Sequence, residues 1–303
     1  MYDDILIPTD GSDSAELAAR HAVVLAEACG SHVHALSVVD ERDYDGGVVD
    51  GEAVISEGRA AAEREARRAV ESVADLVDGG VTTDVTVGVP SEAILAYAAE
   101  AGIDLVVMGT HGRTGVRRFI IGSVAEKVVR RADVPIVTVR VSDAAPAWPP
   151  IERVLVPTDG SEASLAALPH ALDLAERFDA TVDGLYVVDE RTKSSFYNVG
   201  TALEDVVGGM EAAAEEATER IESAAADRGV AVSTTVIEGL PSRAICTHAE
   251  ESGTDLIVMS THGRTGLAHY LLGSVTERVV RNATVPVLTT PTREGDDATP
   301  TGE

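Results

Sequence analysis

The chain has 303 residues, with 51 acidic and 24 basic side chains and a formal net charge of −27 at pH 7. Its length allows two cores of about 150 residues each, and its charge argues against general nucleic-acid binding, because no basic face is evident to neutralise phosphates. No apolar run approaches a membrane span and residues 1–4 lack a signal-peptide pattern, so we expect a cytoplasmic protein without membrane contact.

The chain repeats itself from its first strand onward. Residues 5–9 predict a strand leading into Pro8-Thr-Asp10-Gly-Ser12, and residues 154–158 predict one leading into Pro157-Thr-Asp159-Gly-Ser161. Each copy continues with apolar residues at helical spacing, and Ser12 or Asp13 can cap the first of these helices. Each helix carries a histidine on its apolar face, His21 or His170, and this position favours an interior histidine over a catalyst or metal ligand.

The second strands, 32–39 and 180–188, end in Asp-Glu-Arg, and the two copies then diverge. We interpret residues 43–58 and 192–209 as mobile loops over a site. Long helices rich in Ala, Glu and Arg follow at 59–78 and 203–228, with charges typical of a solvated face. Next come strands 81–87 and 234–237, each before a helix with proline in its first turn.

Residues 103–124 form the stretch around which the chain is organised. A short apolar strand, 105–108, is followed by a loop with Gly109, Gly112 and Gly115. A helix begins after Gly122, where Ser123 can accept a hydrogen bond from the first-turn amides. Backbone N–H groups at such a helix start bind anions, phosphate above all. Alternatively, the glycines serve only a tight turn between strand and helix.

The same pattern returns as Ser260-Thr-His-Gly263-Arg-Thr-Gly266, followed by Gly273-Ser274. Helices 123–132 and 274–283 then lead to final strands 134–139 and 285–289, and Pro135 and Pro286 favour edge positions for these strands. Five strands alternating with four helices predict an α/β fold with an open parallel sheet in each half. The predicted domains are 1–141 and 151–291, joined by a linker, 142–150, and followed by a disordered tail, 292–303.

The glycine loops resemble the nucleotide-binding signature of the universal stress protein family in its ATP-binding branch, and the whole chain resembles two such domains in tandem. The resemblance implies two Rossmann-like domains of the adenine nucleotide alpha hydrolase type, each with strand order 3-2-1-4-5. The ligand crevice then lies between strands one and four. This order places Asp10 beside Gly109 and Asp159 beside Ser260.

The resemblance also implies the nucleotide contacts. In the first repeat they are Pro8, Thr9, Asp10, Val38, Val39, Met108, Gly109, His111, Gly112, Arg113, Gly122, Ser123 and Val124. In the second they are Pro157, Asp159, Val187, Met259, Gly263, Arg264, Gly273, Ser274 and Val275. By its chemistry, Asp10 suits ribose hydroxyls or the adenine amino group. An apolar slot for the adenine ring can be formed by Val38, Val39 and Met108, and the loop amides suit phosphates. As an alternative, Asp10 is a turn or N-cap aspartate.

The first repeat has the richer phosphate loop. It holds Arg113, Arg117 and Arg118, whereas the second offers only Arg264 and His269 and replaces the first glycine by Ser260. We therefore predict tighter nucleotide binding in the first repeat, although the arginines could equally be generic surface charges. His111 and His262 suit a backbone or phosphate contact better than a metal site.

These observations predict an ATP-binding regulatory stress protein whose ligand is ATP, with Mg²⁺ as an optional companion and at most slow hydrolysis. A scaffold without nucleotide is one alternative. An adenylating enzyme is another, because residues 9–14 resemble a Ser-Gly-Gly-x-Asp-Ser loop. The resemblance also makes strands 134–140 and 285–290 candidates for self-association. Since only Lys127 and Lys193 are lysines, a halophilic source is a further hypothesis.

Overall fold

The computed structural model describes residues 1–42, 52–111, 122–141, 151–191, 203–263 and 272–291. The chain divides into two compact units, Met1–Trp148 and Pro149–Glu303. The predicted linker and tail, 142–150 and 292–303, lie outside the described residues. In the described part of the chain no helix is both long enough and apolar enough to cross a membrane.

The first unit is an α/β layered structure built on parallel strands. Its strands are β1 (Asp4–Pro8), β2 (His32–Asp40), β3 (Val81–Gly88), β4 (Leu105–Gly109) and β5 (Ile136–Val139). Its helices are α1 (Asp13–Cys29), α3 (Glu52–Ala74), α4 (Pro90–Glu100) and α5 (Ser123–Arg131). The strands pair in the order β3-β2-β1-β4-β5, which is the predicted order 3-2-1-4-5.

The second unit repeats this arrangement. Its strands are β6 (Arg153–Thr158), β7 (Thr181–Asp189), β8 (Val232–Gly239), β9 (Leu256–Ser260) and β10 (Val287–Thr290). Its helices are α6 (Glu162–Leu165), α7 (Leu168–Phe178), α9 (Leu203–Arg228), α10 (Pro241–Ser252) and α11 (Ser274–Asn282). The strand order is β8-β7-β6-β9-β10, again with parallel pairs.

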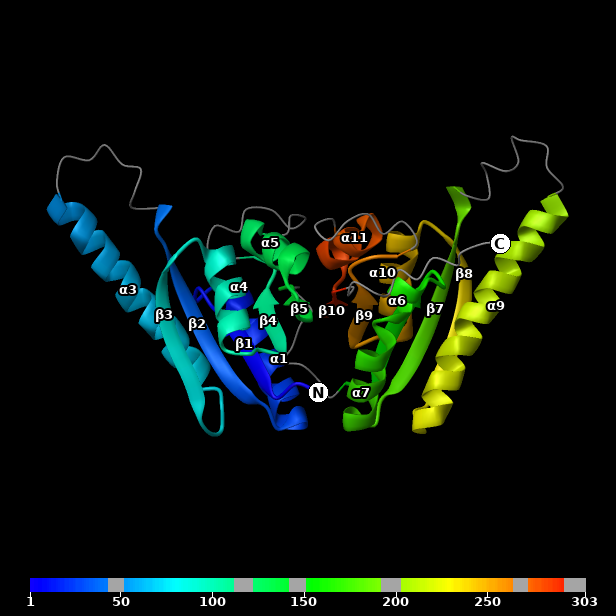
Figure 1. Ribbon diagram of the computed structural model, residues 1–303, viewed down its shortest axis with the longest axis horizontal. Coiled ribbons are helices and arrows are strands. Elements are labelled where there is room, and N and C mark those ends of the chain that lie inside the picture. Colours follow the sequence, from blue (N-terminus) through cyan, green and yellow to red (C-terminus); the bar gives the residue numbers. More distant parts are fainter. Residues whose placement is uncertain (43–51, 112–121, 142–150, 192–202, 264–271, 292–303) are drawn as a thin grey trace. The chain divides into compact units, whose positions relative to one another are not determined.

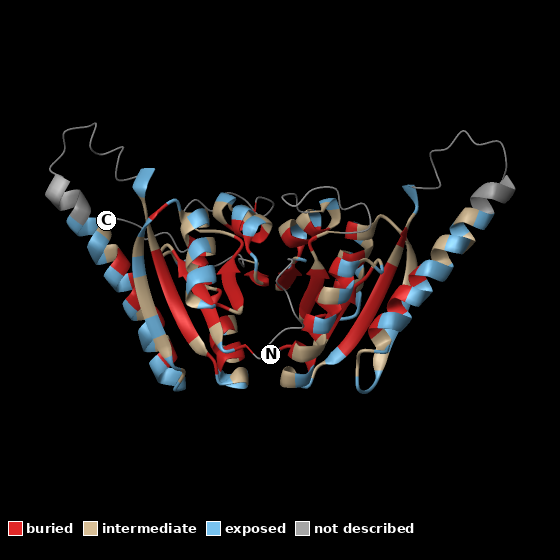
Figure 2. Cartoon of the chain, turned by 180° about the vertical axis from the view of Figure 1, so that it is seen from behind, coloured by how far each residue is buried: buried red, intermediate tan, exposed pale blue. Residues whose placement is uncertain are grey.

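Helices cover both faces of each sheet. In the first unit α1 and α3 lie on one face and α4 and α5 on the other (Figure 1), as right-handed crossovers between parallel strands require. In the second unit α7 packs beside α9, and α10 beside α11. The central strands are almost wholly buried, whereas β3 and β8 are partly exposed and the long helices expose their outer faces (Figure 2). The core of each unit is therefore the space between its sheet and its two helix layers.

Three sequence predictions need correction. The first helix of the second repeat is not continuous: it is split into α6 and α7, and Pro169, which has no N–H to donate, stands at the start of α7. The predicted loops 43–58 and 192–209 are shorter, because α3 and α9 begin at Glu52 and Leu203; the remaining loop residues lie outside the described part. The N-cap of α5 is Gly122, not Ser123.

One core contact between a strand and a helix is made by side chains of different size in the two units. At Gly184 on β7, an added Cβ would lie 3.0 Å from Cδ1 of Ile221 on α9. Ile221 therefore fits only because position 184 has no side chain. The equivalent positions of the first unit are Ala35 and Val70, both buried. Relative to the first unit, the second has one side-chain carbon fewer on the strand and one more on the helix, so the number of side-chain carbons in the contact is the same.

We expect Gly184→Ala to lower the free energy of unfolding by about 1–2 kcal/mol, because it overpacks this contact. The double variant Gly184→Ala/Ile221→Val should recover most of the loss, and urea unfolding of the full chain measures both. Gly80→Ala is the control, since a Cβ there meets nothing within 4 Å. Equal stability of the single and double variants would contradict the volume exchange.

Candidate nucleotide site

A cavity of about 390 Å³ lies in the first unit at the carboxyl ends of its central strands. Ten of the predicted contact residues line it, namely Pro8, Thr9, Asp10, Val38, Val39, Met108, Gly109, Gly122, Ser123 and Val124. They come from β1, β2, β4 and the start of α5, which meet at the point where the strand order reverses. Open parallel sheets bind their ligands at this point.

Asp10 is held at the cavity by a turn of its own. Its Oδ1 accepts hydrogen bonds from the backbone N–H of Ser12, at 3.0 Å, and from the Ser12 hydroxyl, at 2.6 Å. The Ser12 hydroxyl in turn accepts from the N–H of Ala15 and so caps α1. Asp10 is therefore both a turn aspartate and a cavity residue, so the two sequence interpretations are compatible.

The first turn of α5 supplies the donors at the other side of the cavity. Ser123, Val124 and Ala125 line the cavity, and no described side chain caps this turn. Uncapped first-turn amides and the positive end of the helix dipole favour an anion. The pKa of Asp40 at the cavity is lowered, mainly by its hydrogen bond with Arg42 and to a smaller extent by the charge of Lys127 on α5.

Two of the predicted phosphate donors have other roles. The N–H of Gly122 donates to the carbonyl of Thr110 at 2.7 Å, so this amide is already used inside the protein. At Gly109, an added Cβ would lie 2.8 Å from the backbone carbon and oxygen of Ser14, so this glycine is required by the close approach of α1 to β4. Both glycines line the cavity and also have these structural roles, and their contact with a nucleotide stays a prediction.

Of the remaining predicted residues of the first repeat, the structure describes His111. His111 follows β4 but is not among the residues lining the cavity, and its Nδ1 lies 2.9 Å from the Thr110 hydroxyl. Gly112, Arg113, Arg117 and Arg118 are outside the described residues. The arginine argument for the first site is consequently still a sequence prediction.

Sequence reasoning missed about half of the cavity wall. The missed residues are Ala15, Leu36, Ser37, Asp40, Ala62, Glu65, Ala66, Pro90, Ile94, Thr110 and Ala125. Three of them lie on α3, whose polar residues had suggested only a solvated face. The signal was the run of small and apolar residues at helical spacing, Ala62, Ala66, Ala69, Val70 and Val73.

A carboxylate at the rim of the cavity is paired with a cation of its own strand end. The Arg42 Nε donates to Asp40 Oδ1 at 2.7 Å, and this hydrogen bond holds the pKa of Asp40 below its ordinary value. Asp189 and Arg191 form the same pair in the second unit, with Nε at 3.0 Å from Oδ1. The repeated Asp-Glu-Arg motif is thus a charge-paired strand end, which limits the repulsion that Asp40 would exert on an anion.

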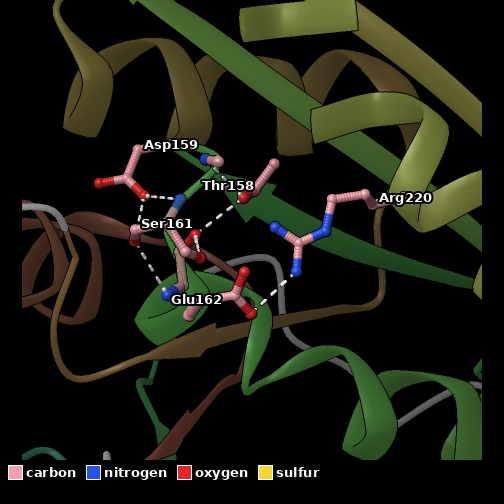
Figure 3. Close-up of polar contacts among 7 residues, drawn as sticks. Thr158, Asp159, Ser161, Glu162 and Arg220 are labelled. Atoms are coloured by element: carbon pink, nitrogen blue, oxygen red, sulfur yellow. Dashed lines mark hydrogen bonds and ion pairs between the residues drawn. The ribbon is translucent and has the colours of Figure 1, made fainter. Parts of the chain in front are cut away.

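In the second unit the predicted residues gather at the corresponding strand ends. Asp159 Oδ1 accepts from the N–H of Ser161 at 3.0 Å and from its hydroxyl at 2.6 Å (Figure 3). The other oxygen, Oδ2, lies so close to Gly263 that an added Cβ there would be 2.6 Å away. Gly273 caps α11 and donates its N–H to the Thr261 carbonyl at 2.8 Å.

The other predicted residues of the second unit fall on the same elements. Pro157, Val187 and Met259 are on β6, β7 and β9, and Ser274 and Val275 begin α11. Arg264 lies outside the described residues. The arrangement of elements is therefore the one seen around the first cavity, although some of the side chains differ in size.

Comparison with known proteins decides the family. The sequence model of the universal stress protein family matches residues 1–140 and again residues 150–291. The chain belongs to the universal stress protein family. Universal stress protein MJ0531 of Methanocaldococcus jannaschii is 41% identical over 137 residues, which are 45% of this chain and 80% of that protein.

A longer relative matches across both units of this universal stress protein. Universal stress protein Rv2005c of Mycobacterium tuberculosis is 30% identical over 234 residues, which are 75% of this chain and 77% of that protein. The crystal structure of a universal stress protein from Archaeoglobus fulgidus covers 95% of this chain and 96% of its own, with a TM-score of 0.67 and 20% identity. That likeness shows the fold, and the tandem arrangement of two family domains predicted from the repeats is confirmed.

Proposed function

We propose that this universal stress protein binds ATP in the cavity of its first unit and acts as a nucleotide-sensing regulatory protein. The observation that carries the proposal is the cavity itself. Its volume is in the range of small-molecule sites, and it joins apolar walls to an acceptor and a set of donors. Val38, Met108 and Ile94 offer the apolar surface that an adenine ring requires.

The polar groups match the rest of the ligand. Asp10 lies where a carboxylate can accept hydrogen bonds from ribose hydroxyls, and the uncapped turn of α5 lies where N–H groups can hold phosphates. A Mg²⁺ ion bound with the phosphates would offset part of their charge in this acidic chain. Within the described residues no cluster of three or more His, Cys, Asp and Glu side chains could hold a metal ion on its own, so we propose Mg²⁺ only as a companion of the nucleotide.

A regulatory role suits the site better than adenylation. The adenylating alternative depends on hydroxyls in residues 9–14. Here Ser12 caps α1, and Ser14 is buried against Gly109. Since these two hydroxyls have structural roles, we expect any hydrolysis to be slow. Release of pyrophosphate on incubation with ATP would favour the enzyme instead.

Mass spectrometry of small molecules released from the purified protein should find ATP. Asp10→Asn keeps an oxygen for the turn with Ser12 but removes the charge, so we expect roughly 10-fold weaker ATP binding by calorimetry. Asp159→Asn is the matched control from the second unit and should leave the measured affinity of the first site unchanged. A wild-type protein that neither carries nor binds an adenine nucleotide would refute the proposal and favour a nucleotide-free scaffold.

A further inference from the structure

The two units differ at four of the positions that line the first cavity. The pairs are Ala15 and Ser164, Ser37 and Tyr186, Gly109 and Ser260, and Ala125 and Thr276. At the other lining positions the second unit has the identical residue, when the repeats are superposed through the strand pairs Val33–Val81 and Val182–Val232. In all four pairs the second unit has the larger side chain.

Tyr186 is the largest of these changes. It is buried and packs against Ala214 and Ala217 of α9, with Val188 beside them. Ala217 corresponds to Ala66, which lines the first cavity together with Ser37. The phenol ring thus occupies the space between β7 and α9 whose counterpart in the first unit belongs to the cavity.

Thr276 closes the second unit at another point. It is buried in the first turn of α11, and its hydroxyl donates to the carbonyl of Ser260 at 2.9 Å. This bond ties the helix start to the end of β9. Ala125, at the same place in the first unit, ends at its Cβ and lines the cavity.

The two smaller changes are Ala15 to Ser164 and Gly109 to Ser260. The Ser164 hydroxyl donates to the Ser161 carbonyl at 2.8 Å and lies 2.8 Å from the Thr158 hydroxyl, in the turn drawn in Figure 3. Ser260 takes the place of Gly109, whose missing Cβ faces α1 in the first unit, and the helix residue opposite changes from Ser14 to Ala163. The hydroxyl that the first unit has on the helix is thus on the strand in the second unit.

We infer that Tyr186, assisted by Thr276, closes the second unit to nucleotide, and that Ser37 keeps the first unit open, so that one chain binds one nucleotide. The inference rests on the proposed function and names the residue that selects between the two sites. Its reason is steric: the polar residues Asp159 and Ser274 are present in the second unit, but the room for a nucleoside is taken by side chains.

Photocrosslinking of the full chain with 8-azido-ATP tests the wild-type protein directly. After proteolysis, labelled peptides should come from residues 1–148, and labelling of 149–303 at equal yield would overturn the inference. Calorimetry should give one ATP per chain, and two per chain would overturn it as well. Absence of binding in either experiment would overturn the proposed function itself, a result distinct from two occupied sites.

Reciprocal variants then test the selecting residue. Ser37→Tyr should weaken ATP binding at least 100-fold, and Tyr186→Ser/Thr276→Ala should raise the stoichiometry from one to two. Tyr186→Phe is the control, because it keeps the ring and should still bind one ATP. Circular dichroism verifies folding, and Ser37→Val, which adds less volume, provides an intermediate loss of affinity if Ser37→Tyr does not fold. Wild-type affinity in a folded Ser37→Tyr or Ser37→Val protein would refute the role of this position.

Discussion

Gly109→Ala is expected to lower the free energy of unfolding of the first unit by about 3 kcal/mol, at the upper end of overpacking effects. The added Cβ would lie 2.8 Å from the backbone carbon and oxygen of Ser14, and closer still to the Ser14 hydroxyl. A side chain can rotate away, but backbone cannot, so α1 would have to move off β4. Urea unfolding of the full chain, followed by far-UV circular dichroism, measures the loss.

Two further variants separate the contributions to this effect. Ser14→Ala combined with Gly109→Ala removes the hydroxyl overlap but leaves the backbone contact, so it should restore only part of the stability. Gly88→Ala is the control, because a Cβ at Gly88 meets nothing within 4 Å, and its effect should be below about 1 kcal/mol. If Gly109→Ala unfolded at the same urea concentration as the wild type, the close packing of α1 on β4 would be disproved.

Acidification from pH 6.5 to pH 4 is expected to destabilise the first unit through His21. This side chain is buried on α1, and burial lowers its pKa to about 4 from an ordinary value of 6.5. Below pH 6.5 the unfolded chain takes up a proton at His21, whereas the folded chain does not. The free energy of unfolding is therefore unaffected by His21 above pH 6.5. It decreases as the pH falls toward 4, by about 3 kcal/mol in total.

Comparison with His21→Leu isolates this contribution from that of the many carboxylates. At constant salt, urea unfolding between pH 7 and pH 4 should show a drop in stability that is smaller in His21→Leu by about 3 kcal/mol. His170→Leu is the matched control, because His170 holds the equivalent place in the second unit but is only half-buried. Parallel pH profiles for wild type and His21→Leu would exclude a neutral buried histidine at this position.

Much of the fold could be predicted from sequence because the signals are local and occur twice. Apolar runs at strand spacing, helical spacing after Ser12 and prolines at Pro90 and Pro241 mark elements that the structure places within a few residues of the prediction. The start of α3 at Glu52 was missed, because the residues before and around it have the glycine-rich, acidic composition of a loop, whereas α9 has the predicted bounds, 203–228. Such a composition does not exclude a helix that packs on a sheet.

About half of the site was predicted, and the missed half shows the limit of motifs. Asp10, Gly122 and the start of α5 are tied to a local pattern at strand ends. Ser37, Ala66 and Ile94 have no motif of their own and became visible only when β2, α3 and α4 came together. The bond between Gly122 and Thr110 is likewise a property of the folded loop, although both residues are in the signature stretch.

The sequence by itself determined the tandem repeat, the family and the strand ends at which a ligand would bind, because these depend on residues close together in the chain. Only the tertiary structure decided which glycines pack against a helix, and which side chains stand in the second unit at the positions that line the first unit's cavity. In the sequence, Ser37 and Tyr186 are two strand residues that belong to no motif. Their effect on the site depends on the distance between a strand and a helix. Tertiary packing sets this distance, and no local sequence pattern predicts it.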